Sequence, residues 1–223
     1  MKSATVVLLL ATAAGLIGCA NTERSRDLAN PNVSATTLAQ QVCSNCHGMK
    51  GSATSPNFPN LAGQTEPYFI AQLTGFRSHD RRDPPGYQYM WGLSRSLTDE
   101  QIKGLAAYYA AQAPEPQPLE GEADRLEAGK AIFESGVPDK SVPACGSCHG
   151  PLGVGNSMFP RLAGQHADYI VKQLTVFQRT DERPEGAIMK TVAHELTPQN
   201  IRDIAGFLQS LSAQQPLALR QKE

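Results

Sequence analysis

Two short cysteine–histidine motifs hold the residues of this sequence that could do chemistry. They are Cys43-Ser44-Asn45-Cys46-His47 and Cys145-Gly146-Ser147-Cys148-His149. On a helix, two thiols three residues apart share a face and can each add to a haem vinyl group, while the adjacent imidazole reaches the iron. The motifs therefore predict two covalently bound haem c groups. A zinc knuckle, a thioredoxin-like redox pair and a surface disulfide are the alternatives for a single C-x-x-C, and the second copy argues against all three.

A haem iron takes two axial ligands, and the histidine of each motif supplies one of them. The candidates for the other ligand are the remaining methionines and histidines of the two halves: Met49, His79 and Met90, then Met158, His166, Met189 and His194. Met49 follows His47 too closely along the chain to reach the opposite face of the same haem. Of the others, only Met90 and Met189 occupy matching positions. We therefore predict them as the distal ligands, the alternative being that they are methionines that fill gaps in the core.

The matching rests on an internal repeat with a period of about 100 residues. The repeat is carried by 61–64 and 162–165 (both Leu-Ala-Gly-Gln), Tyr68 and Tyr169, Phe76 and Phe177, Leu97 and Leu196, and Ile102 and Ile201. So long a period exceeds the unit of a solenoid and fits a duplicated domain. The sequence therefore predicts two tandem domains of the same fold.

The elements that must position the motifs are predicted to be helices. Helices are predicted over 35–43, 66–76 and 122–133 and from Thr98 onward, with loops over 48–60, 77–89 and 136–143. Ser34 is a suitable cap for the first helix, and Thr98 with Gln101 forms a capping box for the last helix of the first half. No segment alternates apolar and polar residues with a period of two, so the fold class is all-α.

Several residues near the motifs are predicted to support a haem. Pro59 and Pro160 could each place a carbonyl where it accepts the N–H of the proximal histidine and fixes the ring, or could simply shape a loop. Four arginines could pair with haem propionates, or could be solvated loop charges: Arg77, Arg82, Arg179 and Arg183. Tyr68, Tyr169 and Trp91 are predicted to pack against a haem rather than to relay electrons.

Cys19 is the one cysteine of five that the two motifs do not use. It follows the apolar run Val6–Ile17, which is too short to cross a hydrocarbon core of about 30 Å and indicates a signal peptide. Leu16-Ile17-Gly18-Cys19 resembles the lipobox of bacterial lipoproteins, whose cleavage leaves an acylated cysteine as the first residue. We therefore predict a lipoprotein signal peptide over 1–18 and a lipidated flexible tether over 19–33. The alternative is an ordinary secretory signal with an incidental cysteine.

Length and charge set further bounds. At 223 residues the chain has room for two small domains, each of about 100 residues. Charged residues make up 18% and the formal net charge is −1, so no strong field marks a nucleic-acid binder. We predict an N-terminal domain over 34–113, a Pro-rich linker over 114–119 and a C-terminal domain over 120–223. The alternating prolines should hold the linker extended.

The combined pattern resembles that of the dihaem cytochrome c4 family, in a lipoprotein variant. Its parts, each present twice, are C-x-x-C-H-G, Pro-x-Leu-Ala-Gly-Gln, Tyr-x-x-x-Gln-Leu-x-x-Phe, a methionine seven residues before Leu-Thr and a final amphipathic helix. The likeness covers roughly residues 34–212, and the lipobox and the stretch 87–89 depart from it. The resemblance implies two class I cytochrome c folds related by a pseudo-two-fold axis, with both haem edges near the domain interface.

The expected function follows from the ligands and from the resemblance. Histidine–methionine ligation leaves no open coordination position, so it suits electron transfer and not bond chemistry. The resemblance implies a periplasmic electron carrier between quinol–cytochrome c reductase and a terminal oxidase or reductase. We expect a membrane anchor through the lipid on Cys19, and neither a nucleic acid nor a small-molecule substrate. A cytochrome subunit of a dehydrogenase or oxidase complex is the alternative, and a dihaem enzyme is a further one.

Overall fold

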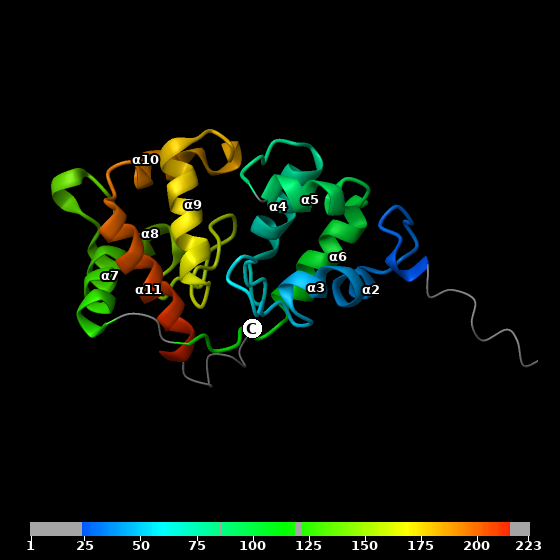
Figure 1. Cartoon of the computed structure of the whole chain (residues 1–223), viewed down its shortest axis with the longest axis horizontal. Coiled ribbons are helices and arrows are strands. Elements are labelled where there is room, and N and C mark those ends of the chain that lie inside the picture. The colour runs from blue at the N-terminus through cyan, green and yellow to red at the C-terminus, as the bar shows by residue number, and fades with distance from the viewer. Residues whose placement is uncertain (1–23, 85, 119–121, 215–223) are drawn as a thin grey trace, which may run out of the picture.

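The structure, a computed structural model, describes residues 24–84, 86–118 and 122–214. Figure 1 shows two helical lobes that lie side by side and are joined by an extended segment. Within the described residues the backbone forms helices and no strand, apart from the isolated bridges Val137–Val142 and Asn156–Phe159. The all-α class predicted from the sequence is confirmed.

The described part of the first lobe consists of a short 3-10 turn, one long helical segment and three further helices. Its elements are η1 (Arg24–Arg26), α2 (Ala35–Leu38), the π-helical turn η2 (Ala39–Cys43), α3 (Ser44–His47), α4 (Glu66–Arg77), α5 (Gly86–Ser94) and α6 (Asp99–Ala110). Because α2, η2 and α3 follow one another without a break, the first motif lies at the end of a single helical segment. The helix predicted over 35–43 therefore continues to His47.

The second lobe repeats this order with one insertion. Its elements are α7 (Ala123–Ser135), η3 (Pro138–Lys140), α8 (Gly146–His149), α9 (Ala167–Arg179), η4 (Pro184–Gly186), α10 (Ala187–Ala193) and α11 (Pro198–Gln214). The predicted insert over 136–143 separates α7 from α8. The second motif therefore lies on a short helix of its own.

Side-chain caps fix the start of the two helices that cross in the first lobe. The Ser34 hydroxyl accepts a hydrogen bond from the Thr37 N–H at the start of α2. At the start of α6 the Thr98 side chain accepts from the Gln101 N–H, and the Gln101 side chain accepts from the Thr98 N–H. These bonds satisfy backbone N–H groups that have no partner within the helix. Both caps were predicted from the sequence, and both are confirmed.

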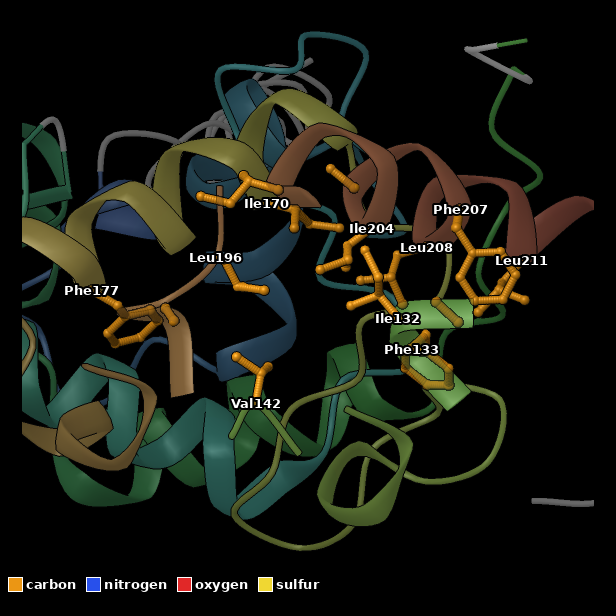
Figure 2. Close-up of a cluster of buried hydrophobic side chains, with 14 residues drawn as sticks. Ile132, Phe133, Val142, Ile170, Phe177, Leu196, Ile204, Phe207, Leu208 and Leu211 are labelled. Carbon is orange, nitrogen blue, oxygen red and sulfur yellow. The ribbon is translucent and has the colours of Figure 1, made fainter. Parts of the chain in front are cut away.

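Each lobe has its own hydrophobic core where its first and last helices cross. In the first lobe, α2 packs on α6, and a Cβ added to Gly104 would lie 2.6 Å from the Ala35 Cβ. In the second lobe, α7 packs on α11, and Gly129 leaves room for the Asp203 carbonyl. Figure 2 shows the second core, to which α7, α9 and α11 contribute side chains. Glycine at each crossing is what lets the two backbones approach.

Two helix boundaries differ from the predictions. α5 begins at Gly86, inside the loop predicted over 77–89. The exposed side chains of residues 87–89 hide the apolar periodicity of its first turn. α7 covers Ala123–Ser135 instead of 122–133.

Part of the predicted tether over 19–33 packs on the first lobe. Leu28 and Val33 contact the hydrophobic core of that lobe. The Nε2 of the buried Gln101 donates to the carbonyls of Asn30 and Val33, so this segment also supplies hydrogen-bond acceptors to a core side chain. The packed body of the first lobe therefore starts before residue 34.

The basis of the lipid-anchor prediction, residues 1–18 and Cys19, lies outside the described residues. Among the helices that the structure describes, none combines the length and the apolar composition that a membrane span requires.

Candidate haem sites and the interdomain seam

The two motif histidines are buried and make the same hydrogen bond. Nδ1 of His47 lies 2.9 Å from the Pro59 carbonyl oxygen, and Nδ1 of His149 lies 2.9 Å from that of Pro160. Since a carbonyl oxygen can only accept, Nδ1 carries the proton and Nε2 is the nitrogen left to bind a metal. The hydrogen bonds predicted for the two prolines are confirmed.

The surroundings of each imidazole favour its neutral form. Burial lowers the pKa of His47 and of His149, and the bonds to the proline carbonyls oppose this only in part. The His47 ring makes a T-shaped contact with Phe58, and the His149 ring makes one with Phe159; the distance between ring centroids is 6.1 Å in both pairs. A neutral imidazole is the form that binds iron.

None of the four motif cysteines forms a disulfide in this structure. Burial raises the pKa of Cys43 and of Cys145 to about 11. A redox pair of the thioredoxin kind depends on a lowered thiol pKa, so this environment argues against that alternative. A structural zinc site needs four protein ligands, and within the described residues no three His, Cys, Asp or Glu side chains converge on one position. Two cysteines that form neither a disulfide nor a zinc site, next to a buried imidazole, fit the attachment of haem c.

Met90 on α5 and Met189 on α10 occupy matching places in the two lobes. Each is half-buried and packs against the hydrophobic core of its own lobe. Cys43 packs against the same core as Met90, and Cys145 packs against the same core as Met189. The structure therefore gives each lobe a thioether, an imidazole and two thiols, which is the donor set that haem c requires.

The other candidates for a distal ligand are placed less suitably. His166 is buried between the lobes, where its Nε2 lies 3.0 Å from the Ala53 carbonyl oxygen. The remaining candidates are exposed side chains: Met49, His79, Met158 and His194. None of them has a counterpart in the other lobe.

The lobes meet through paired hydrogen bonds with pseudo-two-fold symmetry. Gln64 of the first lobe donates from Nε2 to the Arg161 carbonyl (3.1 Å) and accepts the Arg161 N–H at Oε1 (2.7 Å). Gln165 of the second lobe donates to the Asn60 carbonyl (3.0 Å) and accepts the Asn60 N–H (2.8 Å). These are the glutamines of the repeated Leu-Ala-Gly-Gln motif. The motif is therefore a place where the two halves join, which we call the interdomain seam.

A second part of the seam, formed by residues of α4, α9 and the loops that follow them, holds two buried arginines. Each arginine donates hydrogen bonds to a glutamine of its own lobe, to a tyrosine hydroxyl of the other lobe and to the carboxylate two residues further along the chain. For Arg81 these partners are Gln72, Tyr169 and Asp83. For Arg183 they are Gln173, Tyr68 and Glu185. Arg183 also donates to Gln72, which links the two sets. The guanidinium of Arg81 lies 4.4 Å above the Phe76 ring, and that of Arg183 lies 4.7 Å above Phe177.

The two sets differ in their carboxylates. The Asp83 side chain is 1% exposed, whereas that of Glu185 is 25% exposed. Burial alone would raise the pKa of Asp83, but the charge and hydrogen bonds of Arg81, with the bond from Gln173, outweigh burial and hold this pKa below its ordinary value. Asp83 is therefore ionised at neutral pH and balances a buried guanidinium.

Several residues that were expected to lie near a haem make other contacts in the structure. Arg82 is exposed, and its backbone N–H donates to the Glu182 carbonyl of the other lobe. The buried arginine of this loop is its neighbour, Arg81. Arg77 pairs with Asp99, Arg179 is exposed, and Arg183 is buried in the seam rather than solvated. Tyr68 and Tyr169 direct their hydroxyls to the seam arginines.

Trp91 takes part in an aromatic cluster of the first lobe that has no counterpart among the described residues of the second. Its ring lies edge-on to His79 at 4.5 Å between centroids and stacks with Tyr87 at 6.4 Å. The Arg95 guanidinium lies 5.4 Å from the Trp91 centroid. His79, Tyr87 and Arg95 are exposed, so the cluster is a surface feature.

The sequence reasoning missed the seam residues Gln64, Gln165, Arg81 and Asp83. A signal for the glutamines was present, because each recurs in a repeated motif and has no predicted role in its own half. For the arginine the repeat indicated the wrong residue, since the offset of 101 between Phe76 and Phe177 pairs Arg183 with Arg82 and not with Arg81.

The chain is similar to known cytochromes. The Cytochrome c family model matches it twice, at residues 34–111 and 126–212. Cytochrome c4 of Azotobacter vinelandii is 35% identical over 222 residues, which cover 95% of this chain and 100% of that protein. A thiosulfate dehydrogenase electron acceptor of Stutzerimonas stutzeri is 30% identical over 173 residues, 76% of this chain and 78% of that protein.

The fold is similar as well. A solved structure of cytochrome c4 from Acidithiobacillus ferrooxidans has a TM-score of 0.70 and 40% identity, and the match covers 75% of this chain and 97% of that one. Each segment that the Cytochrome c model matches contains one cysteine–histidine motif and one of the two core methionines. The predicted tandem duplication of a cytochrome c fold is confirmed.

Proposed function

Because the chain belongs to the dihaem cytochrome c4 family, we propose that it carries single electrons between redox proteins on the periplasmic side of a membrane. As a member with two Cytochrome c segments, it has two covalently bound haem c groups. Bound haem c supplies reversible one-electron chemistry. The observation that carries the proposal is the matched pair of sites, each with a histidine held by a proline carbonyl and a methionine on the core.

The residue roles follow the two motifs. The proposed attachment residues are Cys43 and Cys46 in the first lobe and Cys145 and Cys148 in the second, and the proposed iron ligands are His47 with Met90 and His149 with Met189. The Pro59 and Pro160 carbonyls hold the histidine rings in one orientation. A ligand set that is fixed in advance needs little rearrangement when the charge of the site changes.

We propose that the chain is not an enzyme. With Met90 and Met189 as ligands, neither site keeps a position for a substrate. At the seam, the cavity bounded by Asn60, Gln64 and Gln165 measures about 10 Å³, which is room for about one water molecule. Because neither site keeps an open iron position and the net charge is only −1, we propose neither a small-molecule substrate nor a nucleic acid as a partner.

Spectra and two variants test the ligand assignment. In the oxidised protein, both haems should show the charge-transfer band between methionine sulfur and iron. Met90→Ala and Met189→Ala should each remove this band from one haem and lower the potential of that haem, because a thioether that stabilises iron(II) is lost. Loss of both bands from either single change would contradict the assignment.

The proposed donor is quinol–cytochrome c reductase, and the proposed acceptor is a terminal oxidase or reductase. The relative from Stutzerimonas stutzeri favours a second candidate, in which the chain accepts electrons from a dehydrogenase as a cytochrome subunit. Stopped-flow reduction of the oxidised protein by purified quinol–cytochrome c reductase, or by a thiosulfate dehydrogenase, separates the two. Faster reduction by the dehydrogenase at equal enzyme concentration would favour the second.

We propose that lipid on Cys19 anchors the protein to the outer or the inner membrane. Each buried CH₂ of an acyl chain contributes about 0.8 kcal/mol, so several chains would hold the protein on a membrane almost permanently. Cys19→Ser should then give a soluble protein that still carries both haems. Mass spectrometry of the mature N-terminus tests the anchor directly, and an unmodified Ala20 or Asn21 at that end would rule it out.

We also propose domains over 34–113, with residues 28–33 packed on its core, and over 120–223, joined by the linker 114–119, that keep one fixed arrangement. The hydrogen bonds of the seam and the packing of Pro114 beside Gly63 support this. Electrons could then enter by one haem and leave by the other without domain motion. Because the loops around the two sites differ, the two potentials should differ, and a redox titration with a single wave for two equivalent haems would contradict this.

A further inference from the structure

The seam glutamines touch the same peptide groups that hold the motif histidines. The carbonyl that accepts from His47 belongs to Pro59, and the N–H that donates to Gln165 Oε1 belongs to Asn60. These are the two ends of one peptide group. His47 of the first lobe is therefore connected, through a single amide, to a side chain of the second lobe.

The second lobe makes the reciprocal connection. His149 donates to the Pro160 carbonyl (2.9 Å), and the N–H of the same peptide group, on Arg161, donates to Gln64 Oε1 (2.7 Å). Both glutamines are 7% exposed, so water does not compete freely for either bond. Each histidine thus has its supporting peptide held by the opposite lobe.

The geometry of a peptide group makes such a connection electronically effective. In a trans amide the C=O and N–H point in opposite directions and share a delocalised π-system. An acceptor on the N–H therefore increases the negative charge on the carbonyl oxygen, and hydrogen bonds in a chain strengthen one another in a buried environment. A stronger bond from the carbonyl to Nδ1–H makes the imidazole a better electron donor to its metal.

We propose that each seam glutamine tunes the reduction potential of the haem in the opposite lobe. Gln165 lowers the potential of the haem bound by His47, and Gln64 lowers that of the haem bound by His149. They are positioning residues that act through the Pro59–Asn60 and Pro160–Arg161 peptides. The inference rests on the proposed roles of the two histidines as iron ligands.

The test measures one haem at a time. In a Met189→Ala background, the methionine–iron band reports only the haem of the first lobe, and in a Met90→Ala background it reports only that of the second. Gln165→Met should raise the potential in the first background and leave it unchanged in the second; Gln64→Met should do the reverse. We expect the ratio of oxidised to reduced haem at a fixed applied potential to change threefold to tenfold, where tenfold corresponds to about 59 mV for a one-electron couple.

Two further variants separate tuning from a looser seam. Thr65→Val removes another hydrogen bond between the lobes, from Thr65 Oγ1 to the Ser157 carbonyl, which does not touch either histidine peptide. It should shift neither potential. Gln165→Glu loses the bond from Nε2 to the Asn60 carbonyl, as Gln165→Met does, but it keeps a stronger acceptor for the Asn60 N–H. It should therefore lower the first potential, whereas simple loosening would move both Gln165 variants in the same direction.

The outcomes distinguish this inference from the proposed function. If each glutamine acts on the haem of its own lobe, or if Thr65→Val shifts the potentials as much as the glutamine variants do, cross-lobe tuning is wrong. If Met90→Ala and Met189→Ala do not each remove one band, the ligand assignment is wrong instead, and this is seen before any glutamine is changed.

Discussion

The two lobes agree in the main hydrogen bonds that join them and differ in exposed features outside those bonds. The glutamine pairs and the arginine sets of the seam have counterparts in both lobes, as do the bonds from the histidines to the proline carbonyls. The outer features do not match. In the part of the chain that the structure describes, the cluster around Trp91 belongs to the first lobe alone and the insert over 136–143 to the second alone.

This contrast shows where the two halves constrain each other. Loss of Gln64 would leave a buried peptide group of the other lobe without its partner, at a cost of about 1–3 kcal/mol. Within the described residues, the ring contacts of the Trp91 cluster and the bridge of the insert lie inside a single lobe. A substitution in the seam therefore affects hydrogen bonds of both lobes, whereas a substitution in the Trp91 cluster or the insert affects contacts of one lobe.

The largest expected effect comes from removing one attachment site. Cys43→Ala combined with Cys46→Ala should give a protein with one haem, because each lobe has its own core and the second does not depend on the packing of the first. Mass spectrometry and pyridine haemochrome spectra measure the haem content. The matched variant Cys145→Ala with Cys148→Ala should lose the other haem, and loss of both haems from either double variant would show that the lobes cannot mature separately.

A smaller but unequal effect is expected from the two buried arginines. Arg81→Met leaves the fully buried Asp83 carboxylate unpaired and should lower the free energy of unfolding by about 3–5 kcal/mol. Arg183→Met leaves the partly exposed Glu185, which water can solvate, and should lower it by about 1–3 kcal/mol. Denaturant unfolding measures both.

The neighbouring exposed Arg82 provides a control. Arg82→Met should change the free energy of unfolding by less than about 0.5 kcal/mol. If Arg81→Met and Arg183→Met lowered the free energy of unfolding equally, the different exposure of Asp83 and Glu185 would make no difference to stability.

The pH dependence of stability should sharpen the same comparison. The folded-state pKa of Asp83 lies below its ordinary value, so its contribution is complete above the unfolded-state pKa of about 3.9 and is lost as the pH falls through the folded-state pKa. Asp83→Asn should therefore destabilise the protein at neutral pH, and the difference from the unmodified chain should shrink in acid below about pH 4. In an Arg81→Met background the sign should reverse near neutral pH, because burial then disfavours the carboxylate. A constant difference at all pH values would contradict the assignment.

The smallest expected effect concerns the outer surface. Arg95→Ala removes the cation from the Trp91 ring and should lower the free energy of unfolding by about 0.5–1 kcal/mol. His194→Ala, at the matching position of the second lobe, has no ring beneath it and should change it by less than about 0.5 kcal/mol. Thermal unfolding followed by circular dichroism compares the two. A larger loss for His194→Ala would mean that the first-lobe cluster contributes nothing specific.

The sequence was sufficient for the features that depend on local pattern. The helix caps at Ser34 and Thr98 and the all-α class follow from spacing and residue type, and the proline carbonyls were found because both prolines stand at the same distance from a repeated motif. The first turn of α5 was missed because polar aromatic residues occupy it. Local periodicity says little where a helix face is exposed.

The seam could not be predicted because it depends on how two lobes are placed relative to each other. Arg81 and Arg82 are adjacent and chemically identical, and only the three-dimensional arrangement decides which one meets Tyr169. The depth of Asp83 is likewise a property of both lobes together. A repeat indicates that two folds are alike, but it does not state which surfaces of those folds face each other.

The reciprocity of the seam has a consequence for the assembly of the protein. Gln64 and Gln165 each donate one hydrogen bond to the opposite lobe and accept one from it. The same reciprocity occurs in the self-complementary interface of a two-fold symmetric homodimer. In this chain the two protomers of such a dimer are fused through the segment that contains Pro114 and Pro118.

A short connection of this kind turns association into an intramolecular step, with an effective concentration in the millimolar range. The contact between the lobes can therefore be polar and modest in area and still remain closed at any dilution. The ratio of the two haems is then fixed at one to one by covalent connection, and does not depend on how much of the protein is present.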